Sequence, residues 1–439
     1  MSLTLLAALS LCLWKGEEHY LELPENISLP ENTAPFEVKQ GVLREVSGAF
    51  DRVEWNATDG AHRVALITVP RSVKAGKYTL GDLKVTVINR VLPEKRTFRL
   101  DLWQHPWAVA RVVGVEPFSK AHYQAMEPLW KMLAKAGQKY ITTTIVSLPW
   151  NHQCYDGYDS MIKDGDYSEF DRYVEFCRKC GLGPYIACYT MVPWGKPVDP
   201  ESPEFENRWK PFLKSFTNHL RKKGWLEYTY ISLDERPPAV MKKVVEFIRK
   251  YGRGLKISAA GNHHPSEFKG IEIDDFSLGI SYVTEDFIQN ELPRRHASGE
   301  STTTYVCCDP PKPNTFLTSA PEEAYFLAVF QKVIGSDGLL RWAYNSWPKD
   351  PKKDGAYGNW PSGDTYLVYP DCEPSVRFLE LNNGIQAFEK WSILEKDVRF
   401  KPALNELAAR YELKKARSAG RDWFRELKTA TDEVLNRHD

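Results

Sequence analysis

Hydrophobic and polar residues alternate through the first quarter of the chain, up to about residue 104. One run of period two is LKVTV at 83–87, another is FRLDL at 98–102, and Gly, Pro and Asn residues separate such runs. Alternation over four to eight residues is typical of strands with one buried face. The pattern predicts a small all-β sandwich domain over residues 1–104.

From residue 105 the pattern changes to short apolar runs separated by helical periodicity. Eight runs are predicted as strands, at 109–115, 140–146, 184–191, 228–233, 255–260, 276–282, 302–308 and 339–345. Helical spacing is found at 121–136, 171–181, 204–223, 239–251, 285–295 and 321–334. No clear helix precedes the first or the sixth of these strands.

Apolar strands that alternate with amphipathic helices favour parallel pairing, because parallel strands need crossover connections and are buried on both faces. Eight such strands are the number that closes a (β/α)8 barrel. We therefore predict an α/β fold with a TIM-like barrel over residues 105–395. A last helix at about 374–392 is expected to pack outside it. Residues 396–439 are predicted as a charged helical tail that docks through Trp423, Phe424 and Leu427.

The charge balance points to a neutral partner. The 439 residues include 58 Lys and Arg and 58 Asp and Glu, and no basic run is long enough to indicate nucleic acid as a partner. No apolar run approaches the ~20 residues of a membrane-spanning helix. A sugar is a partner that fits these constraints, and the sequence does not indicate an oligomeric state.

The N-terminal segment MSLTLLAALSLCLWKG leaves the localisation open. Its apolar stretch resembles the hydrophobic part of a signal peptide, but no basic residue precedes it and no small-residue cleavage site follows. A first strand is the alternative. We expect a periplasmic or secreted protein, with a cytoplasmic one as the alternative.

The eight cysteines form no metal-binding pattern. Cys177 with Cys180 and Cys307 with Cys308 are close in sequence, but no second Cys or His pair completes a zinc site. The adjacent His263 and His264 could join Asp234 as ligands, yet neighbouring side chains seldom converge on one ion. The sequence predicts no metal and no cofactor.

The stretch YTYISLDERPPAV at 228–240 holds the best candidates for chemistry. A buried strand ends there in Asp234 and Glu235, followed by Arg236 and two prolines. Barrel enzymes build their active sites at the C-terminal ends of strands, and the prolines fix a turn that brings both carboxyls to one pocket. Two structural roles compete with catalysis: capping of the next helix, and pairing of Glu235 with Arg236.

Other aromatic and polar residues follow the predicted strands and are candidates for sugar binding. Aromatic faces stack on sugar rings, while Asn, His and Tyr side chains bond hydroxyls. The predicted substrate-binding residues are Trp150, Asn151, His152, Tyr189, Asn262, His263, Tyr282, Trp342, Tyr344, Asn345 and Trp347. Their number at strand ends favours a carbohydrate pocket over a purely structural role.

Adjacent carboxyls suit one type of glycosidase chemistry better than another. Ordinary retaining enzymes use two carboxyls about 5 to 5.5 Å apart, and consecutive residues make an awkward pair for that. In a substrate-assisted reaction, the 2-acetamido oxygen attacks the anomeric carbon. One carboxylate then stabilises the amide, and its neighbour protonates the leaving oxygen.

On these residues, the chain resembles glycoside hydrolase family 123, the β-N-acetylgalactosaminidases. The resemblance rests on LDERP at 233–237, on GLLRWAYNSWPKDP at 338–351 and on GDTYLVYP at 363–370, and extends to about residue 395. It implies a β-sandwich followed by a (β/α)8 domain. The implied activity is the retaining, substrate-assisted removal of terminal β-linked N-acetylgalactosamine, including that of glycolipids.

The resemblance also implies roles for the two carboxyls: Asp234 stabilises the oxazolinium-like intermediate and Glu235 is the acid/base. Glu235 is expected to have a raised pKa while Asp234 stays ionised. The alternatives are an N-acetylglucosaminidase, a neutral-sugar hydrolase that pairs one of the two with Asp309 or Asp350, and a non-catalytic carbohydrate-binding protein.

Overall fold

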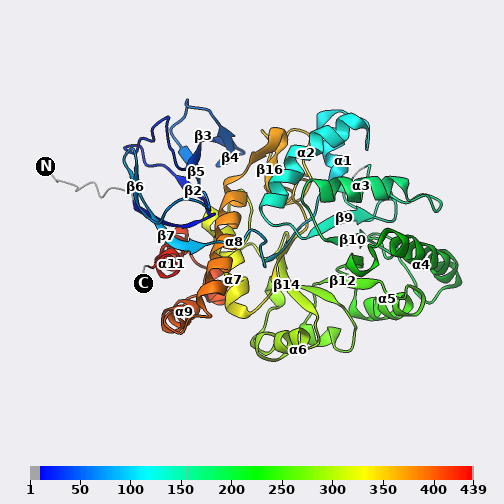
Figure 1. Cartoon of the computed structure of the whole chain (residues 1–439). Helices are drawn as coiled ribbons and strands as arrows, with labels where there is room; N and C mark the ends of the chain where they lie inside the picture. The colour runs from blue at the N-terminus through cyan, green and yellow to red at the C-terminus, as the bar shows by residue number, and fades with distance from the viewer. Residues whose placement is uncertain (1–9, 156, 438–439) are drawn as a thin grey trace. The chain divides into compact units, whose positions relative to one another are not determined.

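The computed structural model describes residues 10–155 and 157–437. The chain forms two compact units, both discontinuous in sequence (Figure 1). The first comprises residues 10–97, 315–333 and 373–437, and the second comprises residues 98–314 and 334–372. Segments from both ends of the chain therefore belong to one unit. The units are thus not consecutive stretches of the chain.

Two β-sheets of the first unit enclose an apolar core. One sheet has the order β1 (Ser10–Lys15), β7 (Leu83–Val91), β6 (Gly76–Leu80), and the other β2 (Glu18–Glu22), β5 (Arg63–Thr68), β3 (Glu37–Val46), β4 (Ala49–Trp55). Leu13, Leu21, Ile67 and Val85 pack together between them. The predicted all-β sandwich is confirmed. Of the ambiguous N-terminal segment, the part from Ser10 is strand, and residues 1–9 lie outside the described residues.

Helices from the second half of the chain complete this unit. They are α7 (Pro321–Ile334), α8 (Val376–Leu394), α9 (Lys401–Ala408), α10 (Leu413–Ala416) and α11 (Arg421–Leu435), with the short strand β17 (Glu373–Pro374) before α8. Val376 and Leu379 of α8 pack against Tyr20 and Val53 of the four-stranded sheet. The last helix, which we expected to pack outside the barrel, thus packs on the sandwich. Phe424 and Leu427 of the predicted tail are buried.

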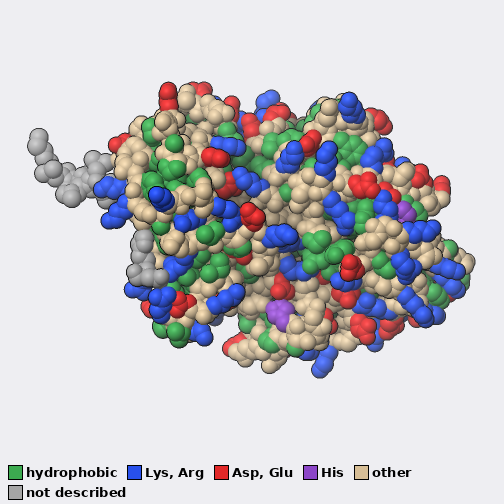
Figure 2. Space-filling model, in the orientation of Figure 1, with side chains coloured by type: hydrophobic (Ala, Val, Ile, Leu, Met, Phe, Trp, Pro, Cys, Tyr) green, Lys and Arg blue, Asp and Glu red, His purple; other side chains and the backbone are tan. Residues whose placement is uncertain are grey.

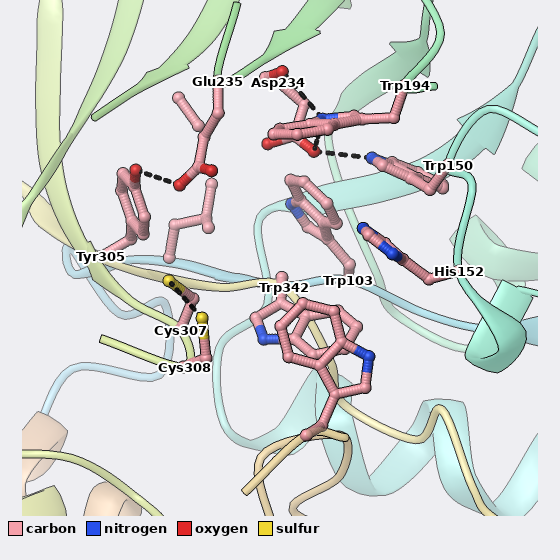
Figure 3. A pocket seen from close by; sticks show the side chains of 13 residues that line it. Trp103, Trp150, His152, Trp194, Asp234, Glu235, Tyr305, Cys307, Cys308 and Trp342 are labelled. Carbon is pink, nitrogen blue, oxygen red and sulfur yellow. Dashed lines mark hydrogen bonds between the residues drawn. The ribbon is translucent and has the colours of Figure 1, made fainter. Parts of the chain in front are cut away.

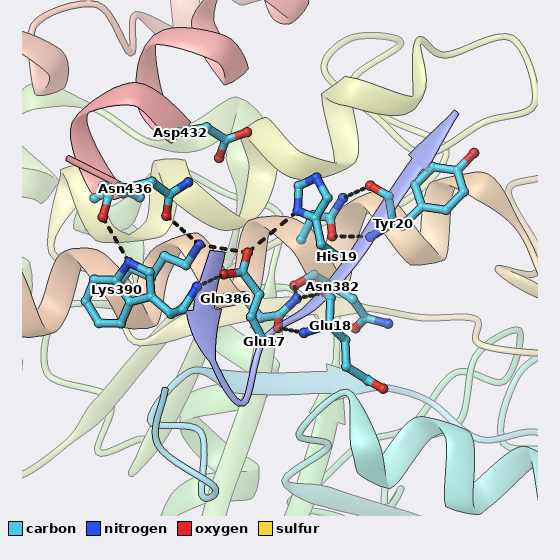
Figure 4. Close-up of polar contacts among 12 residues, drawn as sticks. Glu17, Glu18, His19, Tyr20, Asn382, Gln386, Lys390, Asp432 and Asn436 are labelled. Atoms are coloured by element: carbon cyan, nitrogen blue, oxygen red, sulfur yellow. Dashed lines mark hydrogen bonds and ion pairs between the residues drawn. The ribbon is translucent and has the colours of Figure 1, made fainter. Parts of the chain in front are cut away.

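A buried ion pair also holds α8 to the β-sheets (Figure 4). Lys390 Nζ lies 2.7 Å from Glu17 Oε1, and both side chains are almost fully buried. Burial alone would raise the pKa of Glu17, but the ammonium of Lys390 holds it at about 2. Lys390 also donates to Asn436 Oδ1 at 2.8 Å, just beyond α11. Through Lys390, helix α8 and the end of helix α11 are therefore both joined to the N-terminal strands.

The second unit is an eight-stranded parallel barrel, as predicted. Its strands follow one another around the sheet in chain order: β8 (Arg99–Leu102), β9 (Tyr140–Thr144), β10 (Tyr185–Tyr189), β11 (Thr229–Asp234), β12 (Lys256–Gly261), β13 (Asp275–Gly279), β14 (Ser301–Val306) and β15 (Gly338–Arg341). β15 pairs with β8, so the sheet curls back towards its beginning.

Between β8 and β9, one backbone bridge and the side-chain amides of Gln138 and Gln104 replace a regular ladder. Lys139 N donates to Leu100 O at 2.9 Å. Beside it, Gln138 Oε1 accepts from Leu102 N at 2.9 Å, and its amide nitrogen donates to Tyr140 O at 2.8 Å. The side-chain amide thus takes the place of a missing backbone pair.

The predicted first barrel strand, 109–115, is wrong. Those residues belong to α1 (Pro106–Val113), which has a proline in its first turn and ends at Gly114 in a left-handed conformation. The first strand is β8, which we had assigned to the sandwich because its residues alternate. Its alternation arises because Asp101 lines a small polar cavity together with Ser258 and Thr303 of other barrel strands, which keeps a polar residue between two leucines.

The remaining helices largely agree with the sequence pattern. They are α2 (Lys120–Lys135), α3 (Ser168–Lys179), α4 (Pro203–Lys223) and α5 (Pro238–Tyr251). Only a 3-10 turn, Pro265–Phe268, precedes the sixth strand. The helix predicted at 285–295 is a π-helical turn, Phe287–Glu291, followed by α6 (Leu292–Ala297). The short strand β16 (Val368–Tyr369) ends the long segment after β15.

The surface agrees with the balanced charge of the sequence. Figure 2 shows Lys and Arg side chains interspersed with Asp and Glu over the visible face, without a large patch of either sign there. Among the described residues, no helix combines the length and the apolar character needed to span a bilayer.

Candidate active site

A pocket of about 260 Å³ opens where barrel strands end (Figure 3). Five indoles, two carboxyls and two thiols dominate its wall. The lining residues are Trp103, Trp150, His152, Trp194, Asp234, Glu235, Ala260, Tyr305, Cys307, Cys308, Leu340, Trp342 and Trp360. They come from seven of the eight barrel strands or the segments that follow them, which is how barrel enzymes assemble their sites.

Asp234 and Glu235 reach this pocket together because the backbone turns sharply between them. Asp234 is the last residue of β11, and Glu235 has φ of +47°, a left-handed conformation that costs a non-glycine residue about 1–3 kcal/mol. Glu235 N donates to Ala260 O at 3.0 Å, which fixes the turn. The two predicted catalytic side chains therefore line one wall.

Neither a helix cap nor a direct hydrogen bond to Arg236 holds this pair among the described residues. Helix α5 has Pro237 at its N-cap, no side-chain cap and no acidic residue in its first turn. The guanidinium of Arg236 stacks over the Trp194 ring, 4.1 Å from its centroid. The strained turn thus serves neither a helix cap nor a simple ion pair.

Two indoles hold Asp234 in place. Trp150 Nε1 donates to Asp234 Oδ2 at 2.6 Å, and Trp194 Nε1 donates to the same oxygen at 3.2 Å and to the backbone carbonyl at 3.1 Å (Figure 3). An indole N–H can only donate, so both bonds favour the carboxylate. Among the described residues, none donates to Oδ1, which leaves that oxygen for a ligand.

Glu235 has a separate set of partners. Tyr305 donates its hydroxyl to Glu235 Oε1, and Asn262 Nδ2 donates to Oε2 at 3.3 Å. The Tyr305 side chain comes from β14 and lies on the side of Glu235 that faces away from Asp234 (Figure 3). The two carboxyls are thus positioned independently, although they are consecutive in the chain.

Burial raises the pKa of both carboxyls. Burial and then the neighbouring Glu235 raise the pKa of Asp234 to about 7, while the indole N–H groups oppose the change. Burial also raises the pKa of Glu235, opposed by Tyr305 and by the nearby cations. The expected raised pKa of Glu235 is found; the raised pKa of Asp234 was not expected. Both shifts favour a proton shared by the pair at a higher pH than two exposed carboxyls would hold one.

Aromatic rings form two clusters around the carboxyls, with tilted or edge-to-face contacts. Trp103 lies 5.3 Å from Trp150 and 4.5 Å from Tyr189, measured between ring centroids. Trp342 lies 5.3 Å from Trp360, whose ring is also 5.1 Å from His152. Flat apolar faces with a few polar groups between them are suited to a sugar ring.

The indole of Trp342 is positioned from behind by buried polar groups. Asp364 Oδ1 accepts from Trp342 Nε1 at 3.2 Å and from Arg341 at 2.7 Å. His105 Nε2 contacts the Trp342 carbonyl at 2.8 Å, and burial lowers the pKa of that imidazole to about 3, which keeps it neutral. Asp364 belongs to the GDTYLVYP stretch, so that motif supports the pocket wall.

The predicted sugar-binding residues divide into four groups, of which the last lies in the core. Trp150, His152 and Trp342 line the pocket, and Asn262 contacts Glu235. Tyr189 is buried and packs behind Trp103 and Trp150. Asn151, His263 and Tyr282 lie outside the lining. His263 is near enough that its charge would lower the pKa of Glu235.

Tyr344, Asn345 and Trp347 lie in the core, which corrects their predicted role. All three are fully buried. Asn345 exchanges hydrogen bonds with the backbone of His105 at 3.0 and 3.1 Å, and Trp347 Nε1 donates to Val368 O at 2.6 Å. The segment after β15 is covered by residues 365–367, which pair with it. These side chains therefore cannot touch a sugar in the pocket.

The sequence interpretation missed Trp103, Tyr305 and Trp360 as lining residues. Trp103 directly follows β8, and the misplaced first strand hid this position. Tyr305 lies within a run that we had correctly predicted as a strand, but the side that it faces could not be deduced. Trp360 comes from the long segment after β15, where no periodicity indicates proximity to the pocket.

The alternative carboxyls and metal ligands do not converge on the pocket. Neither Asp309 nor Asp350 lines it: Asp309 accepts from Ser281 at 2.7 Å, and Asp350 pairs with Lys353 at 3.1 Å. Within the part of the chain that the structure describes, no three His, Cys, Asp or Glu side chains are grouped as a metal site would need.

Comparisons with known proteins agree with this geometry. Residues 103–394 match the family model described as glycoside hydrolase 123, catalytic domain. A family 123 glycoside hydrolase from Clostridium perfringens, whose structural analysis concerns glycolipid glycan hydrolysis, superposes with a TM-score of 0.82. Its sequence identity is 25%, and the match covers 97% of this chain and 93% of that one.

A second solved structure, a β-galactosidase from the psychrophilic Marinomonas ef1, matches with a TM-score of 0.41 and 10% identity. That match covers 75% of this chain and 65% of the galactosidase chain. Among curated proteins, no match is found.

Proposed function

Because the chain belongs to glycoside hydrolase family 123, we propose that this hydrolase removes terminal β-linked N-acetylgalactosamine from glycoconjugates, with retention of configuration. In this reaction the 2-acetamido group of the substrate is the nucleophile, and no metal or cofactor takes part. The family membership supports the hydrolysis of glycosidic bonds, and the arrangement of Asp234 and Glu235 supports the finer assignment.

The observation that carries the proposal is the joint presence of two consecutive carboxyls in one pocket, each with its own hydrogen-bond donors. Among the described residues, no other carboxyl lines the pocket. A double displacement would need a nucleophile and an acid/base on opposite sides of the anomeric carbon, about 5 to 5.5 Å apart. A substrate that supplies its own nucleophile removes that need.

Asp234 is suited to orient and stabilise the acetamido group. Its Oδ2 is occupied by two indoles, and Oδ1 is left to accept the amide N–H of the sugar. As the acetamido oxygen bonds to the anomeric carbon, positive charge develops on the amide, and the adjacent carboxylate stabilises it. The amide N–H also favours the ionised form of Asp234, which leaves the shared proton on Glu235.

Glu235 is suited to act as the acid and then as the base. Protonated Glu235 gives its proton to the glycosidic oxygen as the bond to the aglycone breaks. As a carboxylate it then takes a proton from water, which opens the cyclic intermediate from the side the aglycone left. Two inversions give net retention.

The size of the pocket supports action on a terminal sugar. Its volume of about 260 Å³ lies below the ~300 Å³ at which most ligand pockets begin. That space suits one sugar residue rather than an internal stretch of a glycan. The Clostridium perfringens relative is described in connection with glycolipid glycan hydrolysis. We therefore infer that the natural substrate is the glycan of a glycolipid.

The test is turnover of para-nitrophenyl β-N-acetylgalactosaminide beside its gluco epimer and the β-galactoside. We expect hydrolysis of the first, inhibition by a thiazoline that mimics the cyclic intermediate, and the β-anomer of N-acetylgalactosamine as the first product by NMR. Faster hydrolysis of the galactoside, which has no acetamido group, would contradict substrate assistance. Faster hydrolysis of the gluco epimer would correct the sugar but keep the mechanism.

A further inference from the structure

Two adjacent thiols line the pocket, although the proposed reaction uses neither. Cys307 and Cys308 directly follow β14, and their sulfur atoms lie 4.0 Å apart (Figure 3). Figure 3 shows both sulfurs facing each other beside Tyr305 and Trp342. Glycoside hydrolysis needs a carboxylic acid and a stabilised cation, so these thiols require another explanation.

The turn that carries the thiols is held by its own hydrogen bonds. Asn314 Nδ2 donates to Cys307 O at 2.9 Å, and Cys307 N donates to Asp309 O at 3.2 Å. Because the backbone is fixed on both sides of the peptide bond, the two side chains stay next to each other. A reagent that binds both thiols does not have to bring them together first.

Cys308 is the more reactive thiol of the pair. It is exposed, and the hydrogen bond from Cys307 lowers its pKa, against the effect of burial. Four other cysteines are buried, and burial raises the pKa of each of them, that of Cys154 to about 12. Since the thiolate is the reactive form, soft electrophiles should react at Cys308 before those four, and Cys307, whose pKa the same hydrogen bond raises, should react second.

The sulfur separation fits a bridge of one atom better than a direct bond. A disulfide needs its sulfurs about 2.05 Å apart, roughly half of the observed 4.0 Å. Zinc bonds sulfur at about 2.3 Å, and two such bonds at a tetrahedral angle separate the sulfurs by about 3.8 Å. Zinc itself prefers four ligands, and no third ligand joins the pair among the described residues.

We infer that Cys307 and Cys308 form a dithiol site for a soft, low-coordinate metalloid or metal ion, of which trivalent arsenic is the example. With an organoarsenic(III) oxide, the two S–H bonds and the arsenic–oxygen bond break, and two arsenic–sulfur bonds form. The oxygen leaves as water with both protons. No oxidant or reductant is needed, because arsenic stays trivalent.

An ion bound there would inhibit the hydrolase, and this part of the inference rests on the proposed function. Cys307 lies two residues after Tyr305, whose hydroxyl holds Glu235. A bulky group on the two sulfurs would occupy the pocket wall beside the acid/base. Displacements of about 1 Å at such a site can cost about 100-fold in rate.

The experiment uses phenylarsine oxide with the full-length protein, and it reads intact mass and hydrolysis in parallel. We expect one phenylarsenic group per chain, the loss of two free thiols, and about a 100-fold loss of hydrolysis. The dithiol 2,3-dimercaptopropanol should restore activity, whereas the same thiol concentration of 2-mercaptoethanol should not. Cys307→Ser and Cys308→Ser should each abolish stable labelling, and Cys12→Ser is the matched control that keeps it.

Each readout can overturn a separate part of the inference. Stable labelling of the Cys307→Ser or Cys308→Ser variant would show that the arsenical binds elsewhere. Labelling of both thiols without loss of hydrolysis would refute the inhibition but keep the site. If the untreated protein hydrolyses none of the tested glycosides, the proposed function fails, and the mass measurement still decides whether the dithiol binds arsenic.

Discussion

The ends of strands β11 and β15 are alike in sequence but differ in what they expose. Each is a buried strand followed by polar and aromatic residues, and both gave candidates for the active site. At β11, Asp234 and Glu235 line the pocket. At β15, Leu340 and Trp342 line it, while Tyr344, Asn345 and Trp347 are fully buried.

The difference arises from what the chain does next. After β11 the left-handed conformation of Glu235 turns the backbone, and the prolines begin a helix that leads away. After β15 the chain continues into a long segment that returns over itself, so that Ser346 N donates to Thr365 O at 2.9 Å and Leu367 N to Tyr344 O at 2.9 Å. A strand end at the rim of a barrel is therefore not exposed if the following loop covers it.

Removing either carboxyl at β11 should have the largest effect on function. We expect Glu235→Gln and Asp234→Asn each to lower kcat by about 10²–10⁴-fold with little loss of fold, since proton transfer and charge stabilisation are lost. The measurement is turnover of the N-acetylgalactosaminide. Asp350→Asn, a carboxyl outside the pocket, serves as the control and should keep near-normal kcat. Near-normal turnover in both β11 variants would refute the assignment.

A truncation at the end of β15 should instead act on stability. Trp347 is fully buried and its Nε1 donates to Val368 O, so Trp347→Ala should lower the free energy of unfolding by about 3–5 kcal/mol. Chemical denaturation measures this loss. Trp347→Phe, which leaves a smaller cavity, should fold and keep a normal KM. A raised KM in that variant would place Trp347 in the sugar site after all.

The pH dependence should shift when Glu235 loses its tyrosine partner. The Tyr305 hydroxyl favours the carboxylate form, so Tyr305→Phe should raise the pKa of Glu235. A hydrogen bond to a charged group contributes about 1.5–3 kcal/mol, which corresponds to roughly one pKa unit or more. The alkaline limb of the kcat/KM profile, where the acid loses its proton, should therefore move to higher pH by about one unit.

Tyr167→Phe is the matched control for that change, because its hydroxyl donates to Ser215 at 2.9 Å, away from the carboxyls. Its pH profile should match that of the unmodified protein. An unchanged or lowered alkaline limb in Tyr305→Phe would show that Tyr305 does not stabilise ionised Glu235.

The remaining expected effect is a pH-dependent gain in stability. The pKa of Asp234 is about 7 in the folded protein and about 3.9 when unfolded. The folded state thus holds more protons between these values, and it loses stability as pH rises through this range. Asp234→Asn removes that loss, so the melting temperature of the variant relative to the unmodified protein should rise from pH 4 to pH 8, by ~2–4 °C per kcal/mol.

A difference between the two melting temperatures that stays constant over this range would contradict a raised pKa for Asp234. Trp347→Phe, far from any titrating group of the pair, should show such a constant difference. The end of β11 would then titrate in this pH range, whereas the end of β15 would not.

Periodicity by itself predicted most of the architecture. Seven of the eight barrel strands were found from apolar runs between amphipathic helices, because burial on both faces leaves few polar positions. The wrong assignment of β8 to the sandwich also followed from its periodicity. Asp101 lines a polar cavity with residues of other barrel strands, so β8 alternates like a sandwich strand, and the valines of α1 were mistaken for the missing one.

The sequence by itself therefore determined the barrel, the sandwich and the two carboxyls at a strand end, since these depend on local patterns of two to four residues. Only the tertiary structure decided which rim side chains face the pocket. Trp103, Tyr305 and Trp360 come from segments more than 50 residues apart, and the cover over Tyr344 and Asn345 comes from residues 365–367. Such choices depend on contacts between distant segments, which no local pattern encodes.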